Sequence, residues 1–283
     1  MKYIHLNLKR FDIKDTLGGV NRSGELKEWG AQIVQAVQER LEQIKQEHEV
    51  EFAVYLPEAH LISALTAVKQ PETLKIGCQS VYRQDVEKGG NFGAFTTQRT
   101  AKSMAQLGVQ GTIIGHFEER LDKSGLLQQA GVADVTVVND ILNQEMKRAQ
   151  QAGLQVLYCI GESADERAKD WRSVLKVQLE RGLNDIDLSR VVIGYEPTWA
   201  IGVGKQPPTA DEISEVVTYI KEVIPNVPVI YGGGLKFDNA EPLSQITHLD
   251  GGLIALTRFT GEFGFYPDEY IEIIEKFLGI EGE

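Results

Sequence analysis

The sequence predicts an α/β protein, a closed (β/α)8 barrel of eight parallel strands that spans residues 1–283 as a single domain. Two observations favour this fold. Eight short, mostly continuous apolar runs recur along the chain, which is typical of strands buried on both faces. Helical periodicity occurs between them, and this alternation implies parallel strands joined by crossover helices. Eight units favour a closed barrel, although an open doubly wound sheet would also accommodate the pattern.

The expected strands are rich in β-branched side chains. They are Tyr3–Leu8, Glu51–Leu56, Leu74–Gln79, Gly111–Gly115, Gln155–Ile160, Val191–Glu196, Val227–Tyr231 and Gly252–Leu256. Among the helical segments, Lys27–Glu47 has the clearest periodicity, with apolar side chains mostly three or four residues apart. The other expected helices are Ala101–Leu107, Asp140–Ala152, Ala164–Leu183, Ala210–Val223, Ala240–Ser244 and Pro267–Leu278.

The composition narrows the class of function. The net charge is −12 and basic residues form no dense block, so we expect neither a nucleic-acid partner nor a membrane partner. The N-terminus lacks the apolar core of a signal peptide, and no apolar run approaches the ~20 residues that span a bilayer. Cys78 and Cys159 lie in apolar runs without CxxC spacing, which indicates reduced thiols in a cytoplasmic protein and no metal site.

In a barrel, catalytic side chains come from the carboxyl ends of the strands and the loops after them. The first strand ends in Asn7-Leu8-Lys9, and the period of two places Asn7 and Lys9 on one face. A lysine there would neutralise a phosphate or polarise a carbonyl, although a solvated lysine is the simpler interpretation of this tripeptide alone. The fourth strand runs into Gly115-His116, with Glu118 two residues further on. A single histidine at such a place is more often structural.

The sixth strand carries the strongest chemical signal. Glu196 follows a largely apolar strand, so we expect burial to raise its pKa and to suit it to proton abstraction. Pro197 and Trp199 stiffen the start of the loop that follows, while Gly202 and Gly204 offer unobstructed backbone N–H groups to an anion. This pattern indicates a hinged lid over an anion. The alternative is a glycine-rich surface loop with a solvated glutamate.

These motifs together resemble the triosephosphate isomerase family. They occur in the order of the family, at the expected strand ends, from residue 3 to about residue 260. The lid motif and its combination with Gly-His-x-Glu are the most specific, and the resemblance favours the closed barrel. The matching segments are Asn7-Leu8-Lys9, Gly93-Ala94-Phe95-Thr96, Ile114-Gly115-His116…Glu118, Cys159-Ile160-Gly161-Glu162, Tyr195-Glu196-Pro197…Trp199-Ala200-Ile201-Gly202…Gly204-Lys205 and Tyr231-Gly232-Gly233.

The resemblance implies an aldose–ketose isomerase of a small sugar phosphate that uses no metal and no organic cofactor. Glu196 would remove a proton from the carbon beside the carbonyl, and His116 would polarise the carbonyl as a neutral imidazole. Lys9 would supply positive charge, Asn7 a hydrogen bond, and Glu118 a further charge near Lys9. Lid closure would protect the enediolate from losing its phosphate. The lid residues implied in this way are Pro197, Trp199, Gly204 and Lys205.

The phosphate end departs from the family pattern. The strand-7 turn ends in Gly234 where the family has serine, and Pro207 stands where the family offers an N–H to the lid latch. Ala255-Leu256 replaces a glycine pair, so Leu256 adds bulk beside the expected phosphate. Arg258 either grips the anion or lies on the surface. The phosphate-binding residues implied are therefore Gly202, Gly234, Ala255, Leu256 and Arg258.

Other departures lie near the base and near the expected dimer contact. Phe117 replaces a small residue after the catalytic histidine, which leaves the resting position of Glu196 open. The loop that includes residues 83–92 is long, and Gln98 and Glu119 replace a Glu and an Arg of the family. The resemblance implies a homodimer formed through Gly93–Thr96, with an altered contact.

Three functions remain in view. The first is interconversion of dihydroxyacetone phosphate and glyceraldehyde 3-phosphate, which the complete set of chemical residues favours. The second is isomerisation of a four-carbon ketose phosphate of the erythrulose phosphate type, which the altered phosphate end favours. The third is a catalytically weakened barrel that acts as a binding protein. Glu196, His116 and Lys9 argue against it, because fold stability alone does not require these three side chains at one barrel mouth.

Overall fold

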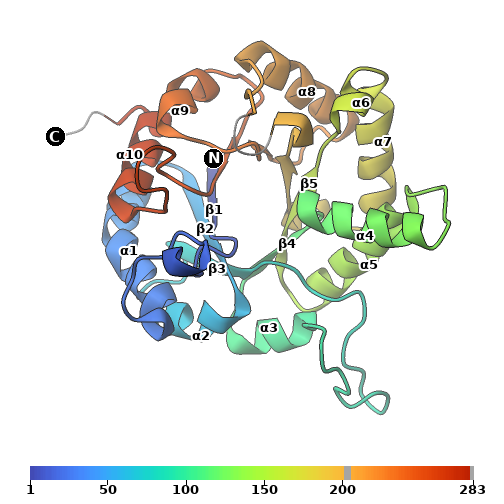
Figure 1. Cartoon of the computed structure of the whole chain (residues 1–283), viewed down its shortest axis with the longest axis horizontal. Helices are drawn as coiled ribbons and strands as arrows, with labels where there is room; N and C mark the ends of the chain where they lie inside the picture. The colour runs from blue at the N-terminus through green and yellow to red at the C-terminus, as the bar shows by residue number, and fades with distance from the viewer. Residues whose placement is uncertain (201–204, 281–283) are drawn as a thin grey trace.

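A computed structural model describes residues 1–200 and 205–280 of the chain. Its eight strands are hydrogen-bonded in sequence order, β1 to β8, and β8 pairs with β1 in parallel to close a barrel. Figure 1 shows this barrel surrounded by helices. The predicted (β/α)8 barrel is therefore confirmed. The strands are β1 (Lys2–Asn7), β2 (Val50–Leu56), β3 (Leu74–Cys78), β4 (Gly111–Ile114), β5 (Gln155–Ile160), β6 (Val191–Tyr195), β7 (Val229–Tyr231) and β8 (Gly251–Ile254).

The helices follow the strands around the barrel. They are α1 (Trp29–Glu47), α2 (Glu58–Ala67), α3 (Ala101–Leu107), α4 (Phe117–Gln129), α5 (Val137–Gln151), α6 (Ala164–Arg167), α7 (Trp171–Gly182), α8 (Ala210–Val223), α9 (Phe237–Ser244) and α10 (Pro267–Leu278). Short 3-10 turns occur at η1 (Asp15–Leu17), η2 (Leu26–Glu28), η3 (Leu188–Arg190) and η4 (Thr198–Ala200). The described residues contain no helix that is both long enough and apolar enough to cross a membrane.

Several expected element boundaries were wrong, and each has a local cause. The expected helix Ala164–Leu183 is two helices, because Ser163 caps α6 in a capping box and the Asp170 side chain caps α7. The sequence pattern missed α2 and α4 altogether. Every residue of α4 is described and none is fully buried, so this helix carries no apolar stripe to detect. Most expected strands ran one or two residues too far, into the turns that carry the polar site.

The two faces of each strand separate the core into two layers. In β2, Phe52 and Val54 belong to the large cluster that packs between the strands and the helices, whereas Ala53 and Tyr55 belong to a smaller second cluster. This alternation follows from the period of two of a strand, and the smaller cluster fills the barrel interior. The barrel is therefore a solid support, and its polar groups lie where the strands end.

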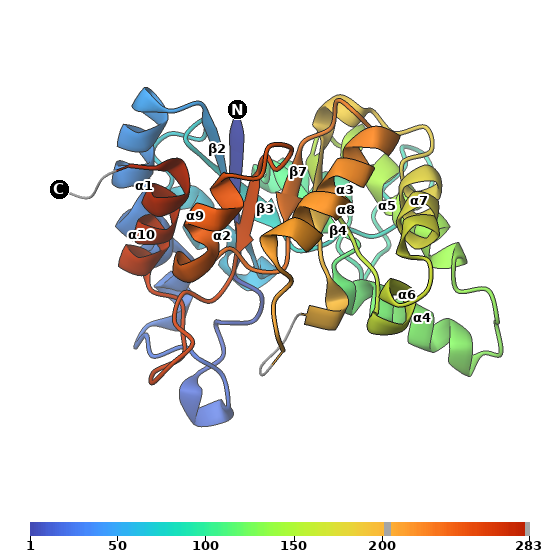
Figure 2. The same cartoon turned by 90° about the horizontal axis from the view of Figure 1, so that it is seen from above.

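Figure 2 shows the barrel from the side, with the N-terminus at one end and α4 at the other. Because β1 begins near that N-terminus and all strands are parallel, α4 lies at the carboxyl ends of the strands. The turns after β1, β4 and β6 are therefore at this end as well, and they carry the candidate site.

Candidate active site

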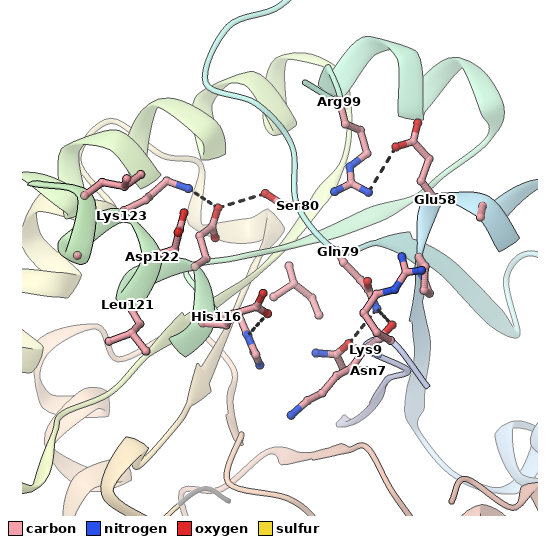
Figure 3. A pocket seen from close by; sticks show the side chains of 18 of the residues that line it. Asn7, Lys9, Glu58, Gln79, Ser80, Arg99, His116, Leu121, Asp122 and Lys123 are labelled. Atoms are coloured by element: carbon pink, nitrogen blue, oxygen red, sulfur yellow. Dashed lines mark hydrogen bonds and ion pairs between the residues drawn. The ribbon is translucent and has the colours of Figure 1, made fainter. Parts of the chain in front are cut away.

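The predicted chemical residues meet in one cavity. Asn7 and Lys9 come from the end of β1, and His116 from the end of β4; all three line a cavity of about 900 Å³. In Figure 3, Asn7 and Lys9 lie across this cavity from His116. Glu196 directly follows β6, and its Oε1 is 3.7 Å from Nε2 of His116. Residues far apart in the sequence are thus brought together at the barrel mouth, as predicted.

Glu196 is held in a tightly fitted position. It is only 2% exposed, and its backbone N–H donates to the Ile160 carbonyl at 2.7 Å. A Cβ atom at Gly232 would be 2.7 Å from Cγ of Glu196, and a Cβ at Gly161 would collide with the Glu196 carbonyl oxygen. Both glycines are therefore needed so that neighbouring backbone can approach the glutamate closely.

The Glu196 carboxylate rests on the start of α4. Its Oε2 accepts a hydrogen bond from the backbone N–H of Phe117 at 2.8 Å. Phe117 is the first residue of this 13-residue helix, where the unpaired N–H groups and the helix dipole favour negative charge. The sequence left the resting position of Glu196 open, because Phe117 has no side-chain hydroxyl. The backbone N–H of Phe117 sets this position instead.

Burial gives Glu196 the protonation behaviour of a base for neutral pH. Loss of solvent raises the pKa of Glu196 to about 7, although the Phe117 N–H and the nearby charge of Lys9 act in the opposite direction. A carboxylate with this pKa is basic enough to accept a carbon-bound proton and is still substantially ionised near neutral pH.

His116 has the opposite shift. It is the N-cap residue of α4, and burial together with the positive charge of Lys9 lowers the pKa of His116 to about 4. The imidazole is therefore neutral near pH 7 and has an N–H that can polarise a carbonyl. Glu118 lies 3.8 Å from Nδ1 of His116, but its side chain is 84% exposed. The contact found for Glu118 is with the neutral His116 imidazole, whereas the resemblance had implied a charge near Lys9.

Asn7 and Lys9 are linked through a residue that the sequence reasoning missed. The Asn7 side-chain oxygen accepts hydrogen bonds from the Lys9 backbone N–H at 2.9 Å and from Nε2 of Gln79 at 3.3 Å. Gln79 also donates to the Lys9 carbonyl at 3.0 Å. Lys9 has a φ of 40°, a left-handed conformation that costs a non-glycine residue free energy. Gln79 directly follows β3, so its position at the carboxyl end of a strand could have identified it as a candidate site residue.

The start of the lid is anchored to a second missed residue, Glu162. This side chain is fully buried, and burial raises its pKa. Its Oε1 accepts hydrogen bonds from Nε1 of Trp199 at 3.0 Å and from the Tyr195 hydroxyl at 2.9 Å. Its carbonyl accepts from the Thr198 hydroxyl at 2.8 Å. The hydrogen bond from Trp199 therefore holds the η4 turn that follows Pro197 against Glu162.

Of the other expected lid residues, Lys205 is exposed, and Gly202 and Gly204 lie outside the described residues. Pro207 is exposed. The strand-7 turn contains Gly234 with a φ of 102°, a conformation in which a serine side chain would be strained. Replacing Gly234 by serine therefore does not simply restore the hydroxyl of the family.

The structure argues against one expected phosphate ligand. Arg258 donates from Nε to Glu269 of α10 at 2.7 Å, and its guanidinium lies 3.7 Å from the centre of the Tyr266 ring. An arginine paired and stacked in this way is not free to bind an anion, so the surface alternative for Arg258 is favoured. Ala255 and Leu256 follow β8 and are half-buried, so they lie in the turn after β8 and not in the strand where they were expected.

The expected dimer loop extends away from the barrel. The segment between β3 and α3 is drawn at the lower right of Figure 1, well outside the ring of helices. Phe92 at its tip is 83% exposed, and Phe95 packs edge-on against Tyr82 with 5.9 Å between ring centres. Among the described residues, no group of three or more His, Cys, Asp and Glu side chains is placed to hold a metal ion.

Comparison with known proteins agrees with this geometry. The family model described as triosephosphate isomerase matches residues 25–276. The chain belongs to the triosephosphate isomerase family. The enzyme of this name from Nostoc punctiforme is 30% identical over 220 residues, which cover 77% of this chain and 80% of the relative. That of Synechococcus sp. (strain JA-2-3B'a(2-13)) is 34% identical over 204 residues, covering 71% and 72%.

A solved structure shows the same fold. The crystal structure of triosephosphate isomerase from Bartonella henselae superimposes with a TM-score of 0.71 at 21% identity, covering 98% of this chain and 99% of that chain. The family membership confirms the predicted isomerase class for this triosephosphate isomerase homologue.

Proposed function

We propose that this protein interconverts dihydroxyacetone phosphate and glyceraldehyde 3-phosphate by proton transfer through an enediolate. The observation that carries the proposal is the contact of Glu196 with His116, which lines the cavity, together with their opposite pKa shifts. The pKa of the Glu196 carboxylate is raised to about 7, and the pKa of the His116 imidazole is lowered to about 4. Because the two pKa values are shifted in opposite directions, Glu196 is suited to act as a base and His116 as a neutral hydrogen-bond donor near pH 7.

The reaction follows from the positions of these side chains. Glu196 removes a proton from the carbon next to the carbonyl, while the N–H of neutral His116 hydrogen-bonds the carbonyl oxygen. The Lys9 ammonium stabilises the negative charge that develops on the enediolate, and Asn7 holds the Lys9 backbone. The protonated Glu196 then returns its proton to the neighbouring carbon, while the hydroxyl proton of the intermediate passes from one oxygen to the other by way of the His116 imidazole. Aldose and ketose are interconverted without loss of any atom.

We propose that the substrate phosphate binds at the ends of β7 and β8. Gly234 and the Ala255-Leu256 turn follow these strands, and backbone N–H groups at such turns are suited to anions. The lid that begins at Pro197 and Trp199 would close over the phosphate. Gly202 would donate a backbone N–H to the phosphate, and Gly204 and Lys205 would form part of the lid. Leu256 adds bulk at this end, which makes the anion site the part where this chain differs most from the family pattern.

The direct test is turnover of dihydroxyacetone phosphate and glyceraldehyde 3-phosphate by the purified full-length chain, measured beside Glu196→Gln. We expect turnover by the wild type and a loss of about 10²- to 10⁴-fold in the variant, as for removal of a positioned base. Absence of wild-type turnover in either direction would contradict the proposal.

A second substrate is favoured by one observation, the altered end of β8. Ala255-Leu256 stands where the family has a glycine pair, so the phosphate position can differ from that of a triose phosphate. Brisk turnover of erythrulose 4-phosphate beside background turnover of the triose phosphates would establish this alternative. Failure of both substrates and of 2-phosphoglycolate binding would favour a binding protein.

We also propose a homodimer formed through the Gly93–Thr96 loop, a single-domain organisation over residues 1–283 and a cytoplasmic location. The exposed tip of the loop at Phe92 supports the dimer, and the two buried free thiols of Cys78 and Cys159 support a reducing compartment. The mass in solution of the wild type and of Phe92→Ser tests the dimer. A monomeric wild type would contradict it.

A further inference from the structure

Helix α4 holds the Glu196 carboxylate but has little apolar contact with the barrel. None of its residues, all of which the structure describes, is fully buried, and Leu121 and Leu126 are 69% and 60% exposed. Leu127 packs against the core, and the other side chains that bind α4 to the barrel are charged: Glu119, Arg120 and Lys123. The placement of its first turn therefore depends on polar contacts.

Glu119 makes the central contact. Its Oε2 accepts a hydrogen bond from the backbone N–H of Gly115 at 2.7 Å. Its Oε1 accepts from the Ser80 hydroxyl at 3.2 Å and from the Lys123 ammonium at 2.7 Å. The dashed lines that end at Ser80 and at Lys123 in Figure 3 mark these two contacts. Lys123 continues to Glu145 of α5 at 3.2 Å, so the first turn of α4 is linked to the segment that follows β3 and to α5.

Gly115 is the residue that turns the chain from β4 into α4. Its φ is 80°, and a Cβ atom there would be 2.7 Å from the Cys159 carbonyl oxygen. Its carbonyl accepts from Nε of Arg120 at 2.9 Å. The N–H of Gly115 is thus bound by Glu119 and its carbonyl by Arg120. The next two residues are His116 and Phe117, whose imidazole and backbone N–H both meet Glu196.

We propose that Glu119 is a positioning residue for the isomerisation, because its grip on the Gly115 N–H sets the turn that places His116 and the Phe117 N–H against Glu196. The inference rests on the proposed function for the chemistry it serves. The resemblance places an arginine at this position in the family, so the hydrogen bond from the Gly115 N–H to a carboxylate at residue 119 is a feature in which this chain differs from the family pattern.

The charge balance of the cluster indicates which property of Glu119 matters. Burial and the negative charge of Glu119 raise the pKa of Glu145. Burial would also raise the pKa of Glu119, but Lys123 and the Gly115 N–H outweigh it and lower that pKa. The two carboxyl groups thus have pKa values shifted in opposite directions, and the Lys123 ammonium contacts both of them. The charge of Glu119 is compensated locally, and what the turn uses is the acceptor oxygen.

Two uncharged variants of similar size separate the acceptor from the charge. Glu119→Gln keeps an oxygen for the Gly115 N–H, and Glu119→Leu removes it. We expect Glu119→Leu to lower kcat for the triose phosphates about 10- to 100-fold, because small misplacements of reacting groups have effects of this size. We expect KM to stay within about threefold, and Glu119→Gln to retain kcat within about fivefold. The exposed Glu222→Gln on α8 is the matched control and should be unchanged, since Glu222 lies outside this cluster.

Equal losses in Glu119→Gln and Glu119→Leu, or kcat of Glu119→Leu within about twofold of wild type, would overturn the inference. Circular dichroism checks that the variants fold. A second readout does not depend on turnover: the amide NMR signals of Gly115 and Phe117 should shift in Glu119→Leu and stay in place in Glu119→Gln. Wild-type protein that isomerises no triose phosphate would refute the proposed function, while unmoved amide signals in Glu119→Leu would refute the positioning role.

Discussion

The two sides of the barrel mouth are built in different ways. On the proton-transfer side, at the ends of β1, β4 and β6, Glu196 and Asn7 are 2% and 4% exposed, and their side chains accept hydrogen bonds from the backbone N–H groups of Phe117 and Lys9. On the proposed anion side, at the ends of β7 and β8, the turns are half-buried, and Arg258 is engaged by Glu269. The reacting side chains of the proton-transfer side match the family motifs, although Phe117 and Glu119 beside them do not, whereas the anion side departs from the motifs in both of its turns.

This difference has a chemical reason. A base and an electrophile must be dehydrated and fixed to within a fraction of an ångström, so their surroundings tolerate little change. A phosphate is bound by several backbone N–H groups at once, and these persist when side chains change. The reaction type is therefore carried by the rigid side, and the choice of substrate is left to the more variable side. The changes below test this division, starting with the largest expected effect.

Removing the base should have the largest effect. Glu196→Gln keeps the shape of the side chain and its hydrogen bond from Phe117, but it cannot accept a carbon-bound proton. We expect kcat to fall by about 10²- to 10⁴-fold with KM little changed. The exposed Glu222→Gln on α8 is the matched control. A variant with more than about a tenth of wild-type kcat would show that another group is the base.

Crowding the base should have the next largest effect. In Gly232→Ala the new Cβ would lie 2.7 Å from Cγ of Glu196, so the carboxylate must move. We expect kcat to fall about 10- to 100-fold. Gly24→Ala, where the added Cβ meets nothing within 4 Å, controls for the substitution itself. Kinetics of Gly232→Ala equal to those of the control would show that the position of Glu196 is less restricted than its packing implies.

Loosening the lid hinge should have a smaller effect. Trp199→Phe keeps an aromatic ring but removes the Nε1 donor to Glu162. Loss of one hydrogen bond of about 0.5–1.5 kcal/mol corresponds to a weakening of 2-phosphoglycolate binding by about 2- to 12-fold. Isothermal calorimetry measures this. Unchanged affinity would mean that the hinge contact does not favour the closed lid.

Changing Arg258 should have the smallest effect. Because its guanidinium is paired with Glu269 and stacked on Tyr266, we expect Arg258→Gln to change KM for the triose phosphates by less than about twofold. The initial-rate dependence on substrate concentration gives this value. A KM increase of tenfold or more would show that Arg258 binds the phosphate and that a positive side chain contributes to the anion side.

Much of the barrel and of the proton-transfer side could be predicted from the sequence. The strands are continuous apolar runs, and Glu196 and His116 stand at their ends, so the one-dimensional pattern already locates them. The pattern could not reveal α4, because most side chains that bind it to the barrel are charged and its stabilising contacts are with distant residues. Gln79 was missed, and Glu162 and Glu119 were given no role at the site, for the same reason. Their roles depend on partners that only the folded chain brings near.

The effect of Phe117 and the engagement of Arg258 could not be predicted either. A side-chain change at residue 117 suggested a lost hydrogen bond, but the bond to Glu196 is made by the backbone, which every residue except proline provides. For Arg258, the sequence showed a cation after a strand but not the competing carboxylate of Glu269 in the next helix.

The central claim is that the site holds a base of raised pKa beside a neutral imidazole. An NMR pH titration of protein labelled in glutamate and histidine side chains tests it directly, with Glu196→Gln and His116→Gln used to assign the signals. We expect Glu196 to titrate near pH 7 and His116 to stay neutral down to about pH 4. The active form, with Glu196 ionised, is then lost as the pH falls through 7. A Glu196 that titrates near pH 4.5 beside a His116 that titrates near pH 6.5 would contradict the account.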